Sequence, residues 1–180
     1  MSPGASPAYP PEMASSHTLL ARLLHWGFVP LYAYGILKQL DDLSQLEDPV
    51  LLGFEVAFAS LFLVVVVLRF SYMRRFETFQ GARRPISPGH GRLARALHLC
   101  MYACLAGLPL SGLLIAGLYA QGLEGGLVQD AVVEVHEVLA ALSYLLIGIH
   151  ITGALMSRSR REGIWSSMVP LWREDGEAGH

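Results

Sequence analysis

Residues 132–156 read VVEVHEVLAALSYLLIGIHITGALM, and they indicate the architecture of the whole chain. A helix rises about 1.5 Å per residue, so about 20 apolar residues are enough to cross the roughly 30 Å hydrocarbon layer of a membrane. The polar residues of this stretch are too few to form the solvent-facing stripe of a soluble helix. We therefore predict a transmembrane helix that carries two histidines, His136 and His150.

Three earlier segments have the same character, and they cover about residues 18–40, 50–72 and 93–119. Hydrophobic residue types make up 53% of the 180 residues and charged types 16%, whereas soluble domains carry about 25% charge. This composition argues against a disordered chain and against a nucleic-acid binder. Cys100 and Cys104 lie in one apolar segment, so no disulfide framework is expected. The expected fold is an all-α, four-helix transmembrane bundle whose helices run up-down-up-down.

Basic residues are concentrated on one side of the predicted bundle. With four spans, both chain ends and the loop between the second and third spans share that side. The basic residues on it or at its helix ends are Arg22, Arg69, Arg74, Arg75, Arg83, Arg84, Arg92, Arg95, Arg158, Arg160, Arg161 and Arg173, and the opposite side has Lys38 alone. The cytoplasmic loops of membrane proteins carry the excess of Lys and Arg. We therefore expect both termini in the cytoplasm.

Three regions follow from this arrangement. Residues 1–16 are rich in Pro, Ala and Ser and are expected to be a disordered tail. Residues 17–157 form the predicted membrane domain. Residues 158–180 form a cytoplasmic tail, in which residues 163–172 either lie along the membrane interface or are disordered. The loop of residues 74–92 contains several Pro and Gly and gives no sign of a soluble catalytic domain.

Ionisable residues inside membrane spans are costly and are functional by default. Within its spans this chain has His25, Glu55, His98, His136 and His150. His136 and His150 lie fourteen residues apart, and at about 100° per residue this places both on one face of the helix. Their separation along the helix axis is about 21 Å. The fourth span therefore suits two sites at different depths, each completed by a residue from another helix.

Depth in the membrane groups these residues into two levels. His25 and His150 each lie about seven residues from the cytoplasmic end of their spans, and His98 enters at a similar depth. Two neutral imidazoles that face each other can hold a haem iron from both sides. Glu55 and His136 lie a few residues inside the opposite boundary. A helix–helix hydrogen bond is the alternative role for each histidine, and zinc is disfavoured because its ligands would have to converge at one point.

These residues carry a resemblance to a known family. Its motifs here are Arg22-x-x-His25-Trp26 at the start of the first span, His98 followed by Pro109 in the third, and His136-Glu137 followed by His150 in the fourth. Over about residues 17–170 the chain resembles the bacterial cytochrome b561 family and the related b-type cytochrome subunits of nickel–iron hydrogenase and formate dehydrogenase. The resemblance implies four helices in a bacterial inner membrane, two b haems near opposite faces, and electron movement between a donor or partner redox protein and membrane quinone.

By that resemblance, His25 and His150 would hold the cytoplasmic haem, and His136 with a residue of the second span would hold the other. The second span departs from the family pattern, because counting back from Arg69 puts Glu55 where the family has a histidine. Glu is a poor axial ligand for an electron-transfer haem. Three outcomes remain open at that level: no haem and a hydrogen bond between His136 and Glu55, a haem held by His136 alone, or weak ligation or proton transfer by Glu55.

Three further residues are candidates for roles at the cytoplasmic level. Arg22 and Arg95 are candidates for binding haem propionates, with anchoring of the helix ends in the membrane as the alternative. His98 is a candidate for a quinone contact or a propionate hydrogen bond.

The leading functional hypothesis is a membrane cytochrome that passes electrons to or from quinone. One alternative is a non-catalytic, haem-bearing anchor subunit of a respiratory complex. Another is a haem-free membrane protein that uses Glu55 and His136 in proton transfer. Oxidation of superoxide is disfavoured because the expected periplasmic side is acidic, and an anionic substrate would be repelled there.

Overall fold

The computed structural model describes residues 19–38, 43–74, 87–162 and 164–169, and every regular element in these ranges is a helix. The long helices are α1 (Leu19–Leu37), α2 (Pro49–Met73), α3 (Pro88–Ala120) and α4 (Leu127–Ser159). The 3₁₀ helix η1 (Leu43–Glu47) precedes α2, and the short helix α5 (Ile164–Met168) follows α4. The all-α prediction is thus confirmed for the described ranges, and the predicted tail of residues 1–16 lies outside them.

Capping residues set the starts of the two central helices. The side chain of Asp48 accepts a hydrogen bond from the backbone N–H of Val50, and a proline occupies the first turn of α2. Ser87 caps α3 in the same way, again followed by proline. This Ser-Pro pair starts α3 at Pro88, earlier than the expected start near residue 93. The last residues of the predicted loop, up to Arg92, are therefore helical.

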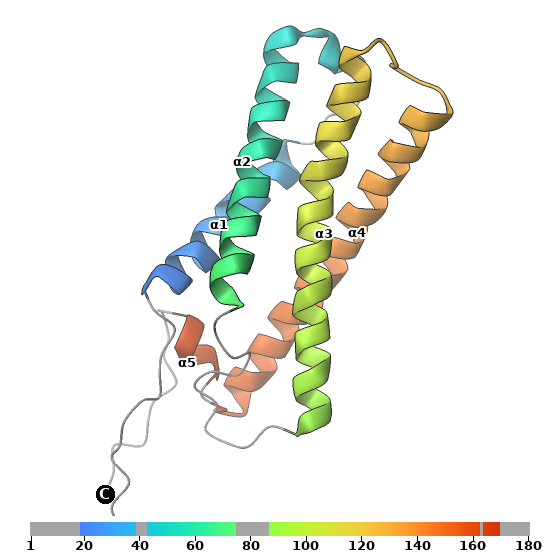
Figure 1. The fold of residues 1–180 in the computed structure, drawn as a ribbon. Helices are drawn as coiled ribbons and strands as arrows, with labels where there is room; N and C mark the ends of the chain where they lie inside the picture. Colours follow the sequence, from blue (N-terminus) through green and yellow to red (C-terminus); the bar gives the residue numbers. More distant parts are fainter. Residues whose placement is uncertain (1–18, 39–42, 75–86, 163, 170–180) are drawn as a thin grey trace, which may run out of the picture.

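Successive long helices run in alternate directions (Figure 1). The start of α1, the end of α2, the start of α3 and the end of α4 all lie toward the end of the molecule that holds α5, which we call the α5 end. The other end holds η1, and we call it the η1 end. α3 lies between α2 and α4 and packs against both, while α1 packs against α2. Residues far apart in sequence are therefore brought together both toward the α5 end and toward the η1 end.

Two apolar clusters fill the space between the helices. Phe28 of α1, Phe62 and Val66 of α2 and Leu105 of α3 form the larger one. The second cluster lies toward the η1 end, where η1 inserts one side chain among residues of α3; its buried members are Leu46, Ile115 and Tyr119. Together with the partly buried side chains packed against them, these clusters join all four long helices.

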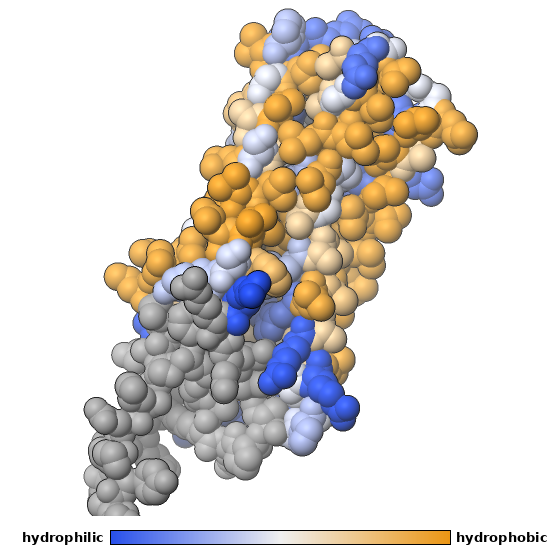
Figure 2. Space-filling view, viewed as in Figure 1, coloured by the Kyte–Doolittle hydropathy of each residue, from blue (hydrophilic) through white to orange (hydrophobic). Residues whose placement is uncertain are grey.

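The surface of the molecule is mainly apolar. Among the described residues, α2, α3 and α4 are long and apolar enough to cross a membrane, and only 11% of the apolar window of α2 and 6% of that of α4 is buried inside the molecule. Hydrophobic side chains cover the middle of the face seen in Figure 2, with hydrophilic ones gathered toward the two ends. Apolar surface this extensive requires lipid rather than water around it. The protein is therefore a membrane protein.

Candidate functional site

Three histidines from three helices come together toward the α5 end. The ring centroids of His25 in α1 and His150 in α4 lie 6.3 Å apart with an angle of 50° between their planes. His98 of α3 lies closer to His150, with 5.2 Å between ring centroids and an edge-on arrangement of 64°. All three side chains are partly buried. The structure therefore brings together the residues that the sequence placed at equal depth.

Arg69 of α2 completes this cluster. Its guanidinium donates a hydrogen bond of 2.7 Å to Nδ1 of His25. The same guanidinium stacks over two aromatic rings, 5.2 Å from the centroid of Phe28 and 5.5 Å from that of Tyr102. From the sequence, Arg69 was interpreted as a basic residue of the cytoplasmic side and used to set the register of the second span, and its place in the site was missed. An arginine near the end of a span reads as membrane anchoring, and only the packing of α2 against α1 and α3 reveals the contact.

The geometry of the histidine cluster fits one metal centre between two rings. Metal–nitrogen bonds to imidazole are about 2.0–2.1 Å long, so two imidazoles on opposite sides of one metal place their ring centroids roughly 6 Å apart. The His25–His150 separation of 6.3 Å meets this requirement, and the His98–His150 separation of 5.2 Å is too short for it. No cluster of three His, Cys, Asp or Glu side chains suited to a bare metal ion occurs among the described residues. The residues present thus fit a haem iron better than zinc.

The short C-terminal helix lies close to this cluster. The indole N–H of Trp26, which adjoins His25, donates a hydrogen bond of 3.0 Å to the backbone carbonyl of Met168 in α5. On the α4 side, the guanidinium of Arg158 lies 5.1 Å from the centroid of the Trp165 ring. These contacts bind α5 to α1 and α4, and α5 lies near the start of α1 and the end of α4 (Figure 1).

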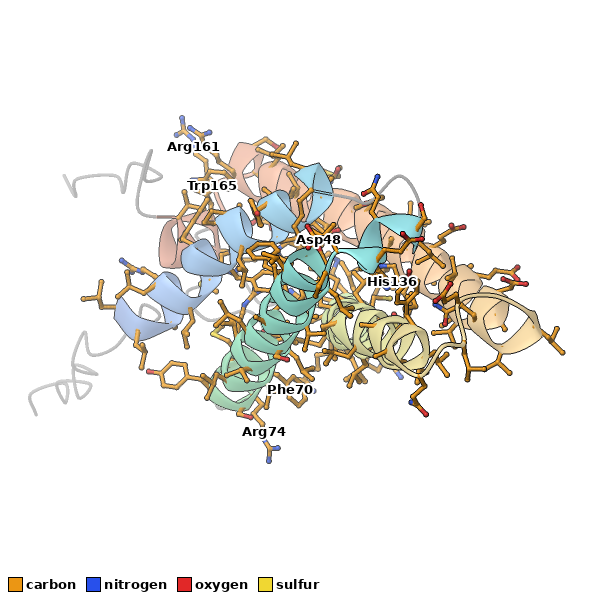
Figure 3. The ribbon with its side chains drawn as sticks, turned by 90° about the horizontal axis from the view of Figure 1, so that it is seen from above. Asp48, Phe70, Arg74, His136, Arg161 and Trp165 are labelled. Atoms are coloured by element: carbon orange, nitrogen blue, oxygen red, sulfur yellow. The ribbon has the colours of Figure 1, made fainter. Side chains whose placement is uncertain are left out.

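The second level, toward the η1 end, has a different chemistry. Glu55 of α2 forms an ion pair with Lys38, which follows directly after α1, and this ammonium group also faces the rings of Phe54 and Phe58. His136 of α4 instead contacts α3, where its Nδ1 lies 2.8 Å from the hydroxyl of Ser111 (Figure 3). The two titratable residues of this level therefore have separate partners.

The contacts at the η1 end correct one of the alternatives that the sequence left open for Glu55 and His136. A hydrogen bond between His136 and Glu55 was left open by the sequence, and the described hydrogen bonds of these residues run instead to Ser111 and Lys38. Lys38 was recognised as the single basic residue of its side but not as the partner of Glu55. Ser111 was missed altogether, because a serine inside an apolar span gives no functional signal in the sequence.

Ser111 determines how the ring of His136 is presented. The hydroxyl of Ser111 donates to backbone carbonyls of the preceding turn, 2.8 Å from Gly107 O and 2.9 Å from Leu108 O. Since a hydroxyl has one proton, its oxygen then accepts from Nδ1–H of His136. The His136 ring lies against Gly112, at which an added Cβ would come within 3.6 Å of it. Among the described residues, no second histidine lies against His136, and the carboxylate of Glu55 is paired with Lys38.

The two arginines that the sequence named as propionate partners differ in their exposure. Arg95 is exposed on the surface of α3, and Arg22 is partly buried on α1. The arginine that the structure places directly on His25 is Arg69.

Comparison with known proteins identifies the family of this chain. A family model described as prokaryotic cytochrome b561 matches residues 16–171, which is most of the chain. No curated protein and no solved structure matches. Members of this family bind b-type haem in the membrane and take part in electron transfer. The chain belongs to the prokaryotic cytochrome b561 family, and it is a membrane b-type cytochrome.

Proposed function

We propose that His25 and His150 hold a single haem b near the α5 end, and that the protein passes electrons between this haem and membrane quinone. The observation that carries the proposal is the 6.3 Å separation of the two rings, which would allow both histidines to hold one iron. Haem b, when bound, supplies reversible one-electron chemistry. Two histidine ligands would leave no open position, which favours electron transfer over oxygen activation.

The residues around this pair have complementary roles in the proposal. Phe28 and Tyr102 flank the site and keep water away from it, which stabilises a buried cofactor. His98 lies at the edge of the pair, where its ring suits a hydrogen bond to a quinone carbonyl or to a haem propionate. Arg22 and Arg95 are the outer cations of this end, suited to propionates or to lipid headgroups.

We infer that α1 is a fourth span and that the α5 end faces the cytoplasm of a bacterial inner membrane. The 19 residues of α1 rise about 28 Å, close to the thickness of the hydrocarbon layer, although Arg22 and His25 lower its hydropathy. The arginines at the ends of α2, α3 and α4 that belong to the α5 end support this orientation; they are Arg74, Arg92, Arg95, Arg158 and Arg160.

The number of haems follows from the chemistry of the η1 end. Glu55 stands where the resemblance calls for a histidine, and its charge is matched by Lys38 rather than by an iron. Carboxylates are weak ligands for electron-transfer haems. We therefore propose one haem per chain, with the Lys38–Glu55 ion pair in place of a second centre.

A haem assay on the purified full-length protein tests the proposal. We expect one haem per chain by the pyridine haemochrome method, with a reduced spectrum typical of two axial histidines. His25→Ala and His150→Ala should each abolish that spectrum, and His90→Ala, at the exposed start of α3, should leave it unchanged. Colourless protein would overturn the haem site, and two haems per chain would overturn the single-centre proposal.

Electron exchange with quinone needs its own measurement. The dithionite-reduced protein, freed of excess reductant, should be reoxidised when a short-chain quinone is added in stopped-flow experiments. A reduced spectrum that quinone leaves unchanged would contradict this step. Copurification of a soluble redox subunit would point instead to an anchor subunit.

A further inference from the structure

Arg69 is a membrane-embedded cation that has no anionic partner among the described residues. It belongs to the last turns of α2, and its hydrogen bond goes to a neutral ring nitrogen of His25. The ion pairs among the described residues are Lys38–Glu55 and Arg160–Glu162, and neither includes Arg69. Its Nε is closed off from the surface and has no hydrogen-bond partner in the described part of the chain.

Burial of the Arg69 guanidinium without an anion is unfavourable in free energy. A guanidinium has five N–H donors and remains charged, so burial leaves several donors to be satisfied. Removing a cation from water costs several kcal/mol unless an anion and further hydrogen bonds compensate for it. The rings of Phe28 and Tyr102 compensate in part, since their faces attract a cation. Among the described residues, no acceptor binds Nε and a terminal nitrogen together.

Iron binding by His25 would remove the one hydrogen bond that Arg69 has there. An imidazole that ligates a metal uses one nitrogen for the metal and carries its proton on the other, from which it donates. Arg69 can only donate, so neither nitrogen of a ligating His25 can accept from it. Arg69 must therefore find another acceptor when the site holds its cofactor.

We propose that Arg69 binds a carboxylate, namely a propionate of the haem held by His25 and His150, and that it releases His25 as the haem enters. This proposal rests on the proposed function. A carboxylate can accept two parallel hydrogen bonds from one guanidinium, which would use both Nε and a terminal nitrogen. Arg69 contacts His25, whose ring lies 6.3 Å from that of His150 between centroids, so its new partner would stay within the same site.

Reconstitution with two forms of the cofactor tests the role of the carboxylate. The full chain, produced without haem, is titrated with haem b and with its dimethyl ester, which lacks the propionate charges. The wild-type protein should bind haem b at least about tenfold more tightly than the ester, because charge-assisted hydrogen bonds to the propionate are lost. In Arg69→Gln this ratio should fall close to one, mainly because haem b itself binds more weakly.

Two further variants keep the test specific. Arg74→Gln, at the exposed end of the same helix, should retain the wild-type ratio, since this side chain points away from the helices (Figure 3). Arg69→Lys should give an intermediate ratio, because an ammonium keeps the charge but cannot form the two parallel hydrogen bonds. If Arg69→Gln does not fold, the wild-type and Arg69→Lys ratios decide the matter.

The outcomes separate this proposal from the one on which it rests. Equal binding of haem b and its ester by the wild-type protein, with a two-histidine spectrum, would overturn the role of Arg69 and leave the haem site intact. An unchanged ratio in Arg69→Gln would do the same. A lipid phosphate as the true partner would show as a melting temperature that rises with phosphatidylglycerol in the wild-type protein but not in Arg69→Gln, again with an unchanged ratio. Failure of the wild-type protein to bind haem b would overturn both proposals.

Discussion

Lys38, the first residue after α1, forms an ion pair with Glu55, which lies in the second turn of α2. The two side chains retain only 15% and 20% of their exposure, so the pair lies largely inside the molecule. The ammonium group also lies 4.8 Å from the centroid of the Phe58 ring. This contact fixes the end of α1 against the start of α2, and it accounts for the single basic residue on the acidic side of the chain.

Breaking this ion pair should destabilise the protein. We expect Lys38→Met and Glu55→Gln each to lower the free energy of unfolding by about 1–3 kcal/mol, because each leaves a polar partner without its counter-charge. The double variant should cost less than the sum of the two single variants, with a coupling of about 1–3 kcal/mol. Thermal unfolding in one detergent measures this, with the exposed Glu124→Gln as control. Strict additivity would contradict the pair, and haem per chain should not change in any variant.

A second test concerns the hydrogen bond between α1 and α4. The hydroxyl groups of Tyr32 and Ser143 lie 2.6 Å apart, and Ser143, which is 1% exposed, also donates to the carbonyl of Ala140. Tyr32 is therefore the donor of the inter-helix hydrogen bond. Tyr32→Phe should cost about 1 kcal/mol, because Ser143 keeps its backbone partner. Ser143→Ala should cost more, up to about 3 kcal/mol, because it leaves the phenol without an acceptor.

The assignment of Tyr32 as the donor is checked by which variant, Tyr32→Phe or Ser143→Ala, loses more stability. Unfolding of both variants is compared with that of Tyr34→Phe, whose side chain is 46% exposed and serves as control. A larger loss of stability in Tyr32→Phe than in Ser143→Ala would mean that the donor and acceptor roles are reversed.

The grouping of the histidines could be predicted from the sequence, and their partners could not. Depth along a span depends on residue count and a fixed rise, so the sequence places His25, His98 and His150 at one level. In the structure the rings of His25 and His98 lie 6.3 Å and 5.2 Å, respectively, from that of His150 between centroids. Which side chain contacts which ring depends on helix rotation and crossing. Arg69 reaches His25 only because α2 packs against α1. Helix periodicity in a uniformly apolar segment does not specify that rotation, because all faces are similar.

Helix boundaries show the same division between local and tertiary information. The start of α3 was set too late, although Ser87 and Pro88 form a local start signal that sequence analysis alone could have used. The partner of Glu55 could not have been found in this way. Lys38 lies just after the end of α1, and it meets Glu55 only because α1 packs against α2.

The hydrogen bond that joins α1 to α5 supports a further prediction. Trp26→Phe removes the indole donor to Met168 O but keeps an aromatic ring beside His25. Trp26 is 42% exposed, so global stability should fall by at most about 1 kcal/mol, whereas α5 should open more often. Hydrogen exchange followed by mass spectrometry should show faster exchange in peptides that cover α5, with α2 peptides as the unchanged internal control. Unchanged exchange in α5 would contradict the anchoring role of Trp26.

A variant of His98 tests whether His25 or His98 would hold the iron together with His150. Its ring is 5.2 Å from that of His150 and meets it edge-on, which is too close for one iron between the two rings. His98→Ala should therefore keep the two-histidine spectrum and one haem per chain, while His25→Ala loses both. Reoxidation by a short-chain quinone should slow in His98→Ala if the ring contacts quinone, and the reduction potential should shift instead if it bonds a propionate. Loss of the spectrum in His98→Ala, with the spectrum kept in His25→Ala, would assign the second axial position to His98.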